Sequence, residues 1–419
     1  MVSIEEAQRK ILEQIALLET EKVSVLKGLK RVTPEGHVAP WDIPPADISA
    51  MDGFAFCHTA LRSDRLRVTG FLPAGDVRIA PVLPGEAIRI MTGAPVPSDC
   101  DTVVPFEDVE DNGDWIHLSS TVKAGSHVRR QGEDIRHGNI VIAAGSLLRP
   151  QEIGMLSAMG STSLAVYRRA RVAILSTGDE LLEPGSTPVP GKIINSNSYS
   201  LAAQVLDAGG DPVMLGIAPD TIDATCDKIK SGLNADFLVI TGGVSAGDRD
   251  FVKTAIKKLG GDITFWKVNV KPGKPLAFAM LEGKPVFALP GNPVSAMVSF
   301  ELFVRPSILK AMGHKHVLRP KVKAVLQESI SNSGMRPQLV RGIVSLHGDR
   351  YFVSTTGNQS SGRLSSFIQG NGLMYLAPKV LKVPGDVVRV FLLDREFEMG
   401  EVLHESYCDT TSLAEAAIL

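Results

Sequence analysis

The chain has 419 residues, which is enough for about three domains of ordinary size. Its 44 lysines and arginines nearly balance 46 aspartates and glutamates, so the net charge of −2 argues against binding to nucleic acid or to an anionic membrane. The four cysteines form no CxxC pair and no apolar run approaches 18 residues, which argues against a disulfide framework, a zinc site or a membrane span and predicts a soluble cytoplasmic protein.

The first predicted element is an amphipathic helix. Ser3 and Glu6 form a capping-box pattern, and apolar residues then recur at helical spacing. From about residue 40 to 139, short β-favouring runs such as RLRVTGF, EAIRIM and DTVVPF alternate with turn signals and predict a small β-rich domain. The segment 140–169, with a predicted helix and a strand, is expected to rejoin the N-terminal helix.

Residues 171–315 alternate apolar runs with helical patterns, which is typical of βαβ units around a doubly wound, mostly parallel sheet. After Arg319-Pro320 the pattern is that of a compact all-β domain, predicted to be a barrel. The predicted domains are 1–43 plus 140–169 (N-terminal helical and linker domain), 44–139 (inserted β-rich domain), 170–316 (α/β catalytic domain), 317–398 (C-terminal β-barrel domain) and 399–419 (tail).

Three strand-to-helix junctions of the α/β domain carry residues suited to chemistry, because ligands collect where parallel strands end. The strand DFLVIT is followed by GGVSAGDRD, whose glycines let the backbone approach a ligand and whose Asp250 is a candidate metal or catalytic carboxylate. The alternative is a tight turn in which Asp250 only caps the next helix. The strand RVAILST leads to Asp179 and Glu180, which form either a second acidic site or a solvated cap.

The third junction is GNPVS, where Asn292 can cap a helix that begins at Pro293 and leaves N–H groups free for an oxyanion. Ser295 adds a hydroxyl, although Asn-Pro is also an ordinary helix start. The segment WKVNVKPGKPLAF supplies Lys267, Lys271 and Lys274, which form either an anion site or a solvated turn.

Several familiar catalytic patterns are absent from the sequence. There is no GxxxxGK[ST] loop and no GxGxxG after a strand, which disfavours a P-loop nucleotidase or a Rossmann dehydrogenase. There is no GxSxG elbow, and the histidines lack metal-ligand spacing. The residues alone therefore predict an α/β enzyme with an anion-binding site that also bears carboxylates.

Seven motifs, taken together and in this order, resemble the MoeA and gephyrin E-domain family from about residue 4 to 395. They are SAMDGFA (49–55), RIMTGAPVP (89–97), GEDI (132–135), STGDEL (176–181), TGGVSAGDRDFVK (241–253), KPGKP (271–275) and LPGNPVS (289–295). The resemblance implies a molybdopterin-binding-like α/β domain in a homodimer, with the active cleft between this domain and the partner's small β domain. It implies insertion of molybdate into adenylyl-molybdopterin with release of AMP, and the upstream molybdopterin adenylyltransferase as a candidate partner.

The resemblance also assigns roles to individual residues. The implied catalytic residues are Asp250, Asp220, Glu180, Asp52, Thr92, Asp134 and Lys267, with Mg²⁺ held by Asp220 and Asp250. The implied molybdate ligands are Lys271, Lys274, Ser295, Arg341 and Ser361, and the implied pterin and nucleotide loop residues are Gly242, Gly243, Ser245, Pro290 and Pro293. Ser360 stands where the family pattern has glycine, which weakens the assignment of Ser361.

Two other functions remain open at this point. A scaffold would keep the shape of the site and cluster partners, but the sequence has no long linker or second assembly domain. An adenylyltransferase would use the same type of α/β domain, but the two β domains and the MDG and MTGAP motifs favour molybdate insertion. The sequence does not distinguish molybdate from tungstate, because both are tetrahedral dianions of similar size.

Overall fold

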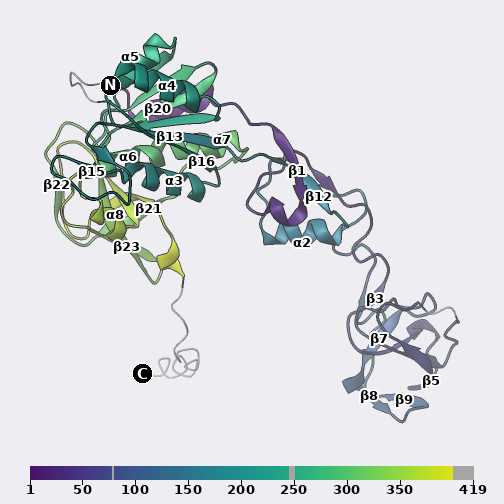
Figure 1. The fold of residues 1–419 in the computed structure, drawn as a ribbon. Coiled ribbons are helices and arrows are strands. Elements are labelled where there is room, and N and C mark those ends of the chain that lie inside the picture. The colour runs from purple at the N-terminus through teal and green to yellow at the C-terminus, as the bar shows by residue number, and fades with distance from the viewer. Residues whose placement is uncertain (78–79, 245–250, 400–419) are drawn as a thin grey trace, which may run out of the picture. The chain divides into compact units, whose positions relative to one another are not determined.

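The structure is a computed structural model that describes residues 1–77, 80–244 and 251–399. The chain forms two compact units, one made of Met1–Glu21 with the residues from Tyr167 onward and the other of Lys22–Val166 (Figure 1). In the described part of the chain, every helix is too short or too polar to cross a bilayer.

The first unit is built on a six-stranded sheet. Its strands, in spatial order, are β16 (Asp211–Ala218), β13 (Arg171–Thr177), β17 (Phe237–Thr241), β20 (Lys284–Leu289), β19 (Ala277–Leu281) and β18 (Asp262–Trp266). β16, β13, β17 and β20 pair in parallel, whereas β19 is antiparallel to both of its neighbours. All five residues of β17 are buried, as expected for a central strand that is covered on both faces.

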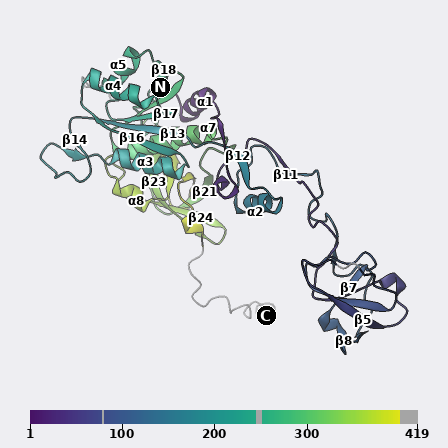
Figure 2. The same ribbon diagram turned by 45° about the vertical axis from the view of Figure 1, so that its right-hand side comes forward.

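Helices cover both faces of this sheet, which confirms the doubly wound α/β prediction (Figures 1 and 2). α4 (Ile222–Gly232) and α5 (Phe251–Lys258) pack on one face. On the other face, the core contains side chains of α1 (Ile4–Gln14), α3 (Asn197–Asp207), α6 (Pro293–Ser299) and α7 (Arg305–Ala311). The short parallel pair β14 (Leu181–Leu182) and β15 (Ile193–Ile194) belongs to a long loop after β13 (Figure 2).

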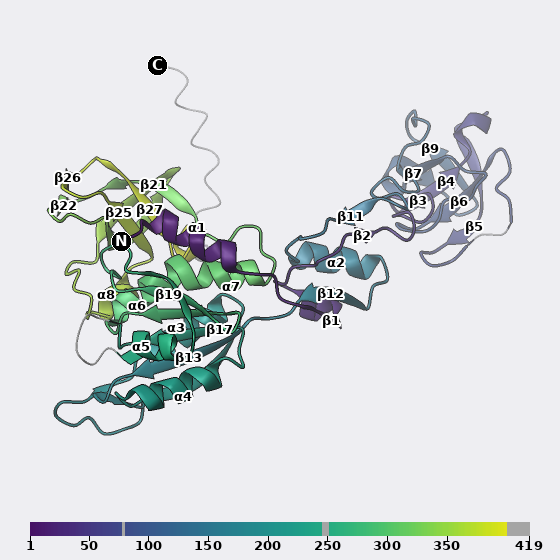
Figure 3. The same ribbon diagram turned by 90° about the horizontal axis from the view of Figure 1, so that it is seen from above.

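A π-helical segment, η4 (Phe300–Val304), joins α6 to α7 and has an identifiable cause. Pro306 has no N–H, so the carbonyl of Leu302 loses its usual intrahelical donor. The side chain of Gln8 on α1 donates to that carbonyl at 2.9 Å. Helix α1 lies beside α7 (Figure 3) and is part of the α/β core, which differs from the expected grouping of the whole segment 1–43 with 140–169.

The C-terminal region of the first unit is a closed barrel, as predicted. Its strands, in spatial order, are β21 (Lys321–Leu326), β24 (Arg350–Thr355), β23 (Gln338–His347), β25 (Gly372–Leu376) and β27 (Val387–Leu392). A two-stranded sheet of β22 (Ile330–Asn332) and β26 (Val380–Lys382) accompanies it. The short helix α8 (Ser365–Gln369) was not expected from the sequence.

The second unit is dominated by a six-stranded, mostly antiparallel sheet. Its strands, in spatial order, are β7 (Thr102–Pro105), β4 (Gly53–Phe56), β6 (Glu86–Ile90), β5 (Arg65–Leu72), β9 (Trp115–Leu118) and β8 (Val109–Asp111). The remaining elements are the pairs β1 (Thr20–Ser24) with β12 (Ser163–Tyr167), β2 (His37–Val38) with β11 (Ile140–Ile142) and β3 (Ile48–Ser49) with β10 (Val128–Arg129), and the helix α2 (Pro150–Ala158). The predicted small β-rich region is therefore present.

Candidate active site

A cavity of about 510 Å³ lies at the carboxyl ends of β13, β17 and β20. The chain runs from β13 to β16 on one side and later to β17 on the other side of β13, so the sheet order reverses between β13 and β17. In an open parallel sheet this is the point where ligands bind. Thr177 at the end of β13 and Thr241 at the end of β17 both line the cavity.

The glycine turn after β17 forms one wall of the cavity. Gly242 has a φ of 92°, and a Cβ there would lie 2.5 Å from the carbonyl oxygen of Thr177, so only glycine fits. Four of the predicted pterin and nucleotide loop residues, Gly242, Gly243, Pro290 and Pro293, line the cavity together. The fifth, Ser245, lies outside the described residues.

The GNP turn after β20 forms a second wall. Asn292 is the N-cap of α6 and Pro293 is its first residue, as the sequence predicts. Ser295 is buried, with 4% of its surface exposed, and lines the cavity. The N–H of Val294 donates to the carbonyl of Ser361 and that of Ala296 to the carbonyl of Asn292, and Pro293 has no N–H. The N–H and the hydroxyl of Ser295 are therefore the donors of this turn at this side of the cavity, which suits an oxyanion.

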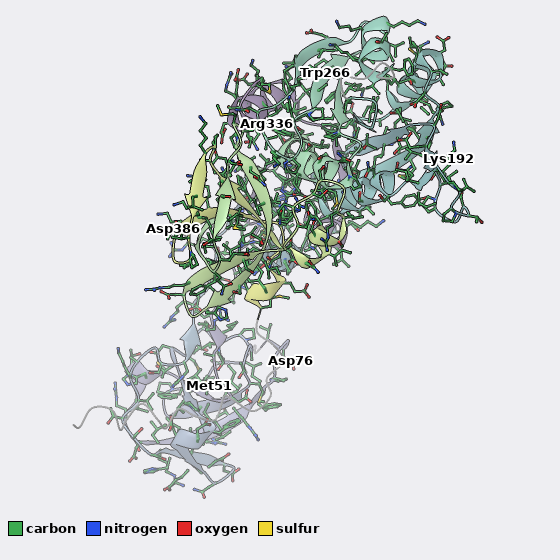
Figure 4. All side chains as sticks on the ribbon, turned by 90° about the vertical axis from the view of Figure 1, so that its left-hand side faces the viewer. Met51, Asp76, Lys192, Trp266, Arg336 and Asp386 are labelled. Atoms are coloured by element: carbon green, nitrogen blue, oxygen red, sulfur yellow. The ribbon has the colours of Figure 1, made fainter. Side chains whose placement is uncertain are left out.

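Carboxylates lie on another side of the cavity, on the loops after β13 and β16. The backbone N–H of Asp220 donates to Asp179 at 3.1 Å, and the N–H of Asp179 donates to Asp220 at 3.4 Å, so the two loops hold each other. Asp220 and Glu180 line the cavity. Lys192, on the long loop (Figure 4), donates to the backbone oxygen of Asp179. Asp250, the other predicted acid, lies outside the described residues.

The donors at this side suit Mg²⁺ only in part. No group of three His, Cys, Asp or Glu side chains within residues 1–77, 80–244 and 251–399 could hold a metal ion. Mg²⁺ is usually bound by one or two carboxylates together with substrate phosphates and water. The Asp220 carboxylate, which lines the cavity, fits that pattern.

A buried polar network under the cavity was missed by the sequence reasoning. Asn197, at the start of α3, donates its Nδ2 to Thr241 at 3.0 Å and to the carbonyl of Gly291 at 2.7 Å. It therefore ties the glycine turn after β17 to the GNP turn after β20. The Oδ1 atom of Asn197 and the hydroxyl of Thr177 are buried without a hydrogen-bond partner among the described residues. A run of Asn and Ser just before a helix, NSNS, was the available signal.

The predicted lysines follow β18 and are outside the cavity lining. Lys267 has a φ of 96°, which is rare for a residue other than glycine. The backbone of Lys271 bonds to both Pro337 and Leu339 beside β23, so the KPGKP turn lies against the barrel. Pro275, the last residue of this turn, does line the cavity.

Arg341 on β23 organises a loop of the barrel domain. It is 1% exposed and donates to the carbonyls of Gln359 and Ser360, at 3.2 and 3.0 Å, and to the hydroxyl of Ser366 at 3.0 Å. Burial lowers the pKa of its guanidinium. The carbonyl of Ser361 accepts from Val294, so this loop lies at the start of α6 beside Ser295.

Ser360, which stands in place of the expected glycine, does not strain this loop. Its φ is not positive, so a side chain is tolerated there. Its N–H donates to the side chain of Asn358 at 2.9 Å, and its carbonyl accepts from Arg341. The substitution therefore leaves the loop with Ser361 in contact with α6.

The second unit carries the other three predicted residues. The backbone N–H and the hydroxyl of Thr92 both donate to Asp52 Oδ1 at 2.7 Å, and these two bonds hold the pKa of Asp52 below its usual value. The residue after Asp52 has to be glycine, because a Cβ at Gly53 would lie 1.9 Å from the carbonyl oxygen of Val104 on β7. Asp134 is anchored by its N–H, which donates to the carbonyl of Ile43.

The fold and the cavity define a multidomain α/β protein with a candidate ligand site at the carboxyl edge of its sheet. Three family models match the chain: the MoeA N-terminal region (domain I and II) over residues 2–160, a probable molybdopterin binding domain over 173–310, and the MoeA C-terminal region (domain IV) over 323–393. The chain therefore belongs to the MoeA family of molybdenum cofactor biosynthesis.

Known relatives and a solved structure agree with this family. Molybdopterin molybdenumtransferase 2 of Mycobacterium tuberculosis is 36% identical over 93% of this chain and 97% of its own length. Molybdopterin molybdenumtransferase of Haemophilus influenzae is 34% identical over 90% of this chain and 94% of its own length. The crystal structure of the molybdopterin biosynthesis moeA protein of Pyrococcus horikoshii OT3 has a TM-score of 0.79 at 30% identity and covers 94% of this chain and 100% of its own.

Proposed function

We propose that this protein is a molybdopterin molybdenumtransferase, which inserts molybdate into adenylyl-molybdopterin and releases AMP. The observation that carries the proposal is the cavity at the sheet's switch point, in a chain that matches the family over almost its full length. One side of the cavity offers N–H and hydroxyl donors, and another side offers carboxylates. A substrate that combines a pyrophosphate with a polar heterocycle suits such walls.

Molybdate is a dianion and needs cationic and hydrogen-bonding donors. We assign this role to Lys271, Lys274, Ser295, Arg341 and Ser361. Ser295 and the loop of Ser361 lie together at the start of α6, which supports the assignment. Arg341 would act mainly by holding that loop and by its charge, because most of its donors are directed at loop carbonyls. Lys267 completes the cationic side.

The acidic side would hold Mg²⁺ through Asp220 and Asp250. When bound, the ion would neutralise phosphate charge and polarise the phosphoryl group. Glu180 and Asp220 would then orient the substrate, and Asp52, Thr92 and Asp134 would be contributed by the small β domain of the partner copy in the proposed homodimer. Catalysis would come mostly from positioning and from charge neutralisation.

The remaining features of the proposal follow from the family. The protein would form a homodimer in the cytoplasm, with an active site shared between the α/β domain of one copy and the small β domain of the other. The upstream molybdopterin adenylyltransferase is the proposed supplier of the substrate. The division into four domains and a tail from residue 399 stays a prediction in its boundaries, apart from α1, which belongs to the α/β core.

One reaction tests the function. Purified protein is supplied with adenylyl-molybdopterin, molybdate and Mg²⁺, and both AMP release and molybdenum transfer are followed. The proposed enzyme gives both products. An adenylyltransferase would instead require ATP and free molybdopterin, and a scaffold would give neither product, so either result would overturn the proposal. Repeating the reaction with tungstate measures the metal preference.

A further inference from the structure

Arg89 of the second unit is held between two aromatic rings at one end of the sheet. It lies on β6, with its guanidinium carbon 5.7 Å from the ring centre of Phe71 on β5 and 4.8 Å from that of Phe106 after β7. Phe106 is itself fixed by an edge contact with buried Phe54, at 5.3 Å between ring centres. The two rings hold an exposed guanidinium in one place without using its N–H donors.

No hydrogen bond or ion pair to the Arg89 guanidinium occurs within the described ranges. Two other arginines of the same unit, by contrast, are paired with acids. Arg129 pairs with Glu133 at 2.6 Å, and Arg130 pairs with Asp47 at 2.6 Å. An arginine that is fixed by aromatic rings and keeps its fork of donors free is well suited to bind a carboxylate or a phosphate.

Arg89 is connected to the Asp52–Thr92 pair through Phe106 and through the end of β6. Thr92 follows β6 by two residues, and the N–H of Phe106 donates to the backbone oxygen of Asp52 at 3.2 Å, so Phe106 contacts both Arg89 and Asp52. Thr92 occupies Asp52 Oδ1, and no described residue donates to Oδ2. Met51, which precedes Asp52, is exposed (Figure 4). One end of the sheet therefore presents a free cation and a free carboxylate oxygen that do not pair with each other.

A ligand that satisfies both groups carries an anion for the guanidinium and a hydrogen-bond donor for the carboxylate oxygen. A ribose phosphate has this chemistry, because an aspartate accepts from sugar hydroxyls and an arginine binds the phosphate. We propose that Arg89 binds the phosphoryl group of the nucleotide half of the substrate, with the ribose hydroxyls donating to Asp52. This inference rests on the proposed function, from which the adenylyl substrate comes, but it concerns a residue to which the family resemblance assigns no role.

The test measures binding of AMP and of adenosine to the full chain by calorimetry. Arg89→Gln removes the charge, and we expect it to weaken AMP binding about tenfold or more, which corresponds to about 1.4 kcal/mol, while adenosine binding is unchanged. Phe71→Leu keeps the charge but loosens its position, and we expect a smaller loss. Melting temperatures should not change, because Arg89 and Phe71 are exposed.

Arg65→Gln is the matched control. Arg65 also stacks on an exposed ring, that of Trp115 at 4.5 Å, but it is six residues from Phe71 along β5, or about 20 Å. AMP binding should be unchanged in this variant. Equal weakening by Arg65→Gln, or wild-type binding of AMP by Arg89→Gln, would overturn the inference. So would the absence of AMP binding by the wild-type protein.

AMP release by the wild-type protein separates this inference from the proposed function. If the wild type releases AMP and Arg89→Gln keeps its KM for adenylyl-molybdopterin and its inhibition by AMP, the function stands and the inference fails. If the wild type releases no AMP but Arg89→Gln weakens AMP binding selectively, the proposed function fails and the nucleotide site stands.

Discussion

Asn197→Asp is the sharpest test of how the cavity is built. The substitution keeps the size of the side chain but replaces its Nδ2 donor by an oxygen. That oxygen would face the carbonyl of Gly291 at 2.7 Å and the hydroxyl of Thr241 at 3.0 Å. Thr241 could donate to the new oxygen only by giving up its bond to the carbonyl of Pro290, which it makes at 3.0 Å. Two attractive contacts therefore become unfavourable ones.

The expected effect follows from those two contacts. Each hydrogen bond contributes about 1 kcal/mol net, so their loss corresponds to about 2 kcal/mol, or roughly 30-fold in kcat/KM. We expect this loss for adenylyl-molybdopterin at saturating molybdate, measured by AMP release. Asn197→Ala loses the same two bonds and should show about this loss, whereas Asn197→Asp should show a larger one, because it also brings a charge against the carbonyl of Gly291. If the aspartate variant folds and works like the wild type, Asn197 does not position the two turns.

Asn234→Asp is the matched control for this substitution. Asn234 is exposed after α4 and donates only weakly, to the carbonyl of Ser231 at 3.3 Å. The substitution Asn234→Asp introduces the same charge at a position that does not line the cavity. Its kinetics should be those of the wild type. A matching loss in Asn234→Asp would show that the added charge, and not the loss of the Asn197 bonds to Thr241 and Gly291, lowers the activity.

Three further predictions concern the acids and the buried arginine. Asp220→Asn should lower the rate of AMP release about tenfold or more, whereas Asp223→Asn, at an exposed position, should change it little. Removal of metal by EDTA should abolish AMP release in the wild type until Mg²⁺ is restored. Equal rates of AMP release in the two variants would contradict the Mg²⁺ assignment. Arg341→Met should destabilise the barrel region by about 3 kcal/mol in urea unfolding and raise the KM for molybdate, and an unchanged KM in a folded variant would remove it from that site. Burial disfavours the charge on Asp236, yet Arg168 holds the pKa of Asp236 below its usual value. The charged Asp236 therefore stabilises the fold above pH 3.8, and this stabilisation is lost as the pH falls through the lowered pKa. Asp236→Asn should lower the melting temperature at pH 7 and make it fall less towards pH 3, and a melting profile like that of the wild type would refute this.

The elements that the sequence predicted well are those whose signal is local. The apolar run DFLVIT predicted a strand of the parallel sheet, which is β17, and Asn292-Pro293 predicted the start of α6. Ser3 caps α1 as expected, with its hydroxyl accepting from the N–H of Glu6 at 3.1 Å. In each case a few neighbouring residues determine the local backbone, so no distant contact was needed for the prediction.

The features that the sequence did not predict depend on distant contacts. Helix α1 is held in the α/β core by burial of Ile4, Ala7 and Ile11. Gln8 adds a bond to a carbonyl that Pro306 leaves free, almost 300 residues away. Asn197 was not singled out in the sequence, because its bonds to Thr241 and Gly291 exist only when β17 and β20 lie side by side in the sheet. Arg341 was expected to be a molybdate ligand. In the structure its guanidinium donates to the carbonyls of Gln359 and Ser360, and these contacts are not visible in the sequence.

The sheet order gives a physical reason for keeping acids and cations apart in this site. Asp220 and Glu180 follow β16 and β13, whereas the lysines lie between β18 and β19. From β13 to β19 the sheet takes three steps, through β17 and β20, or about 14 Å at the usual strand spacing. Molybdate held on the cationic side would then be more than a Debye length from the carboxylates, so their repulsion of the dianion would be largely screened where solvent intervenes. The cavity between β13 and β20 is the space in which a substrate could extend from the acidic side towards the cationic side.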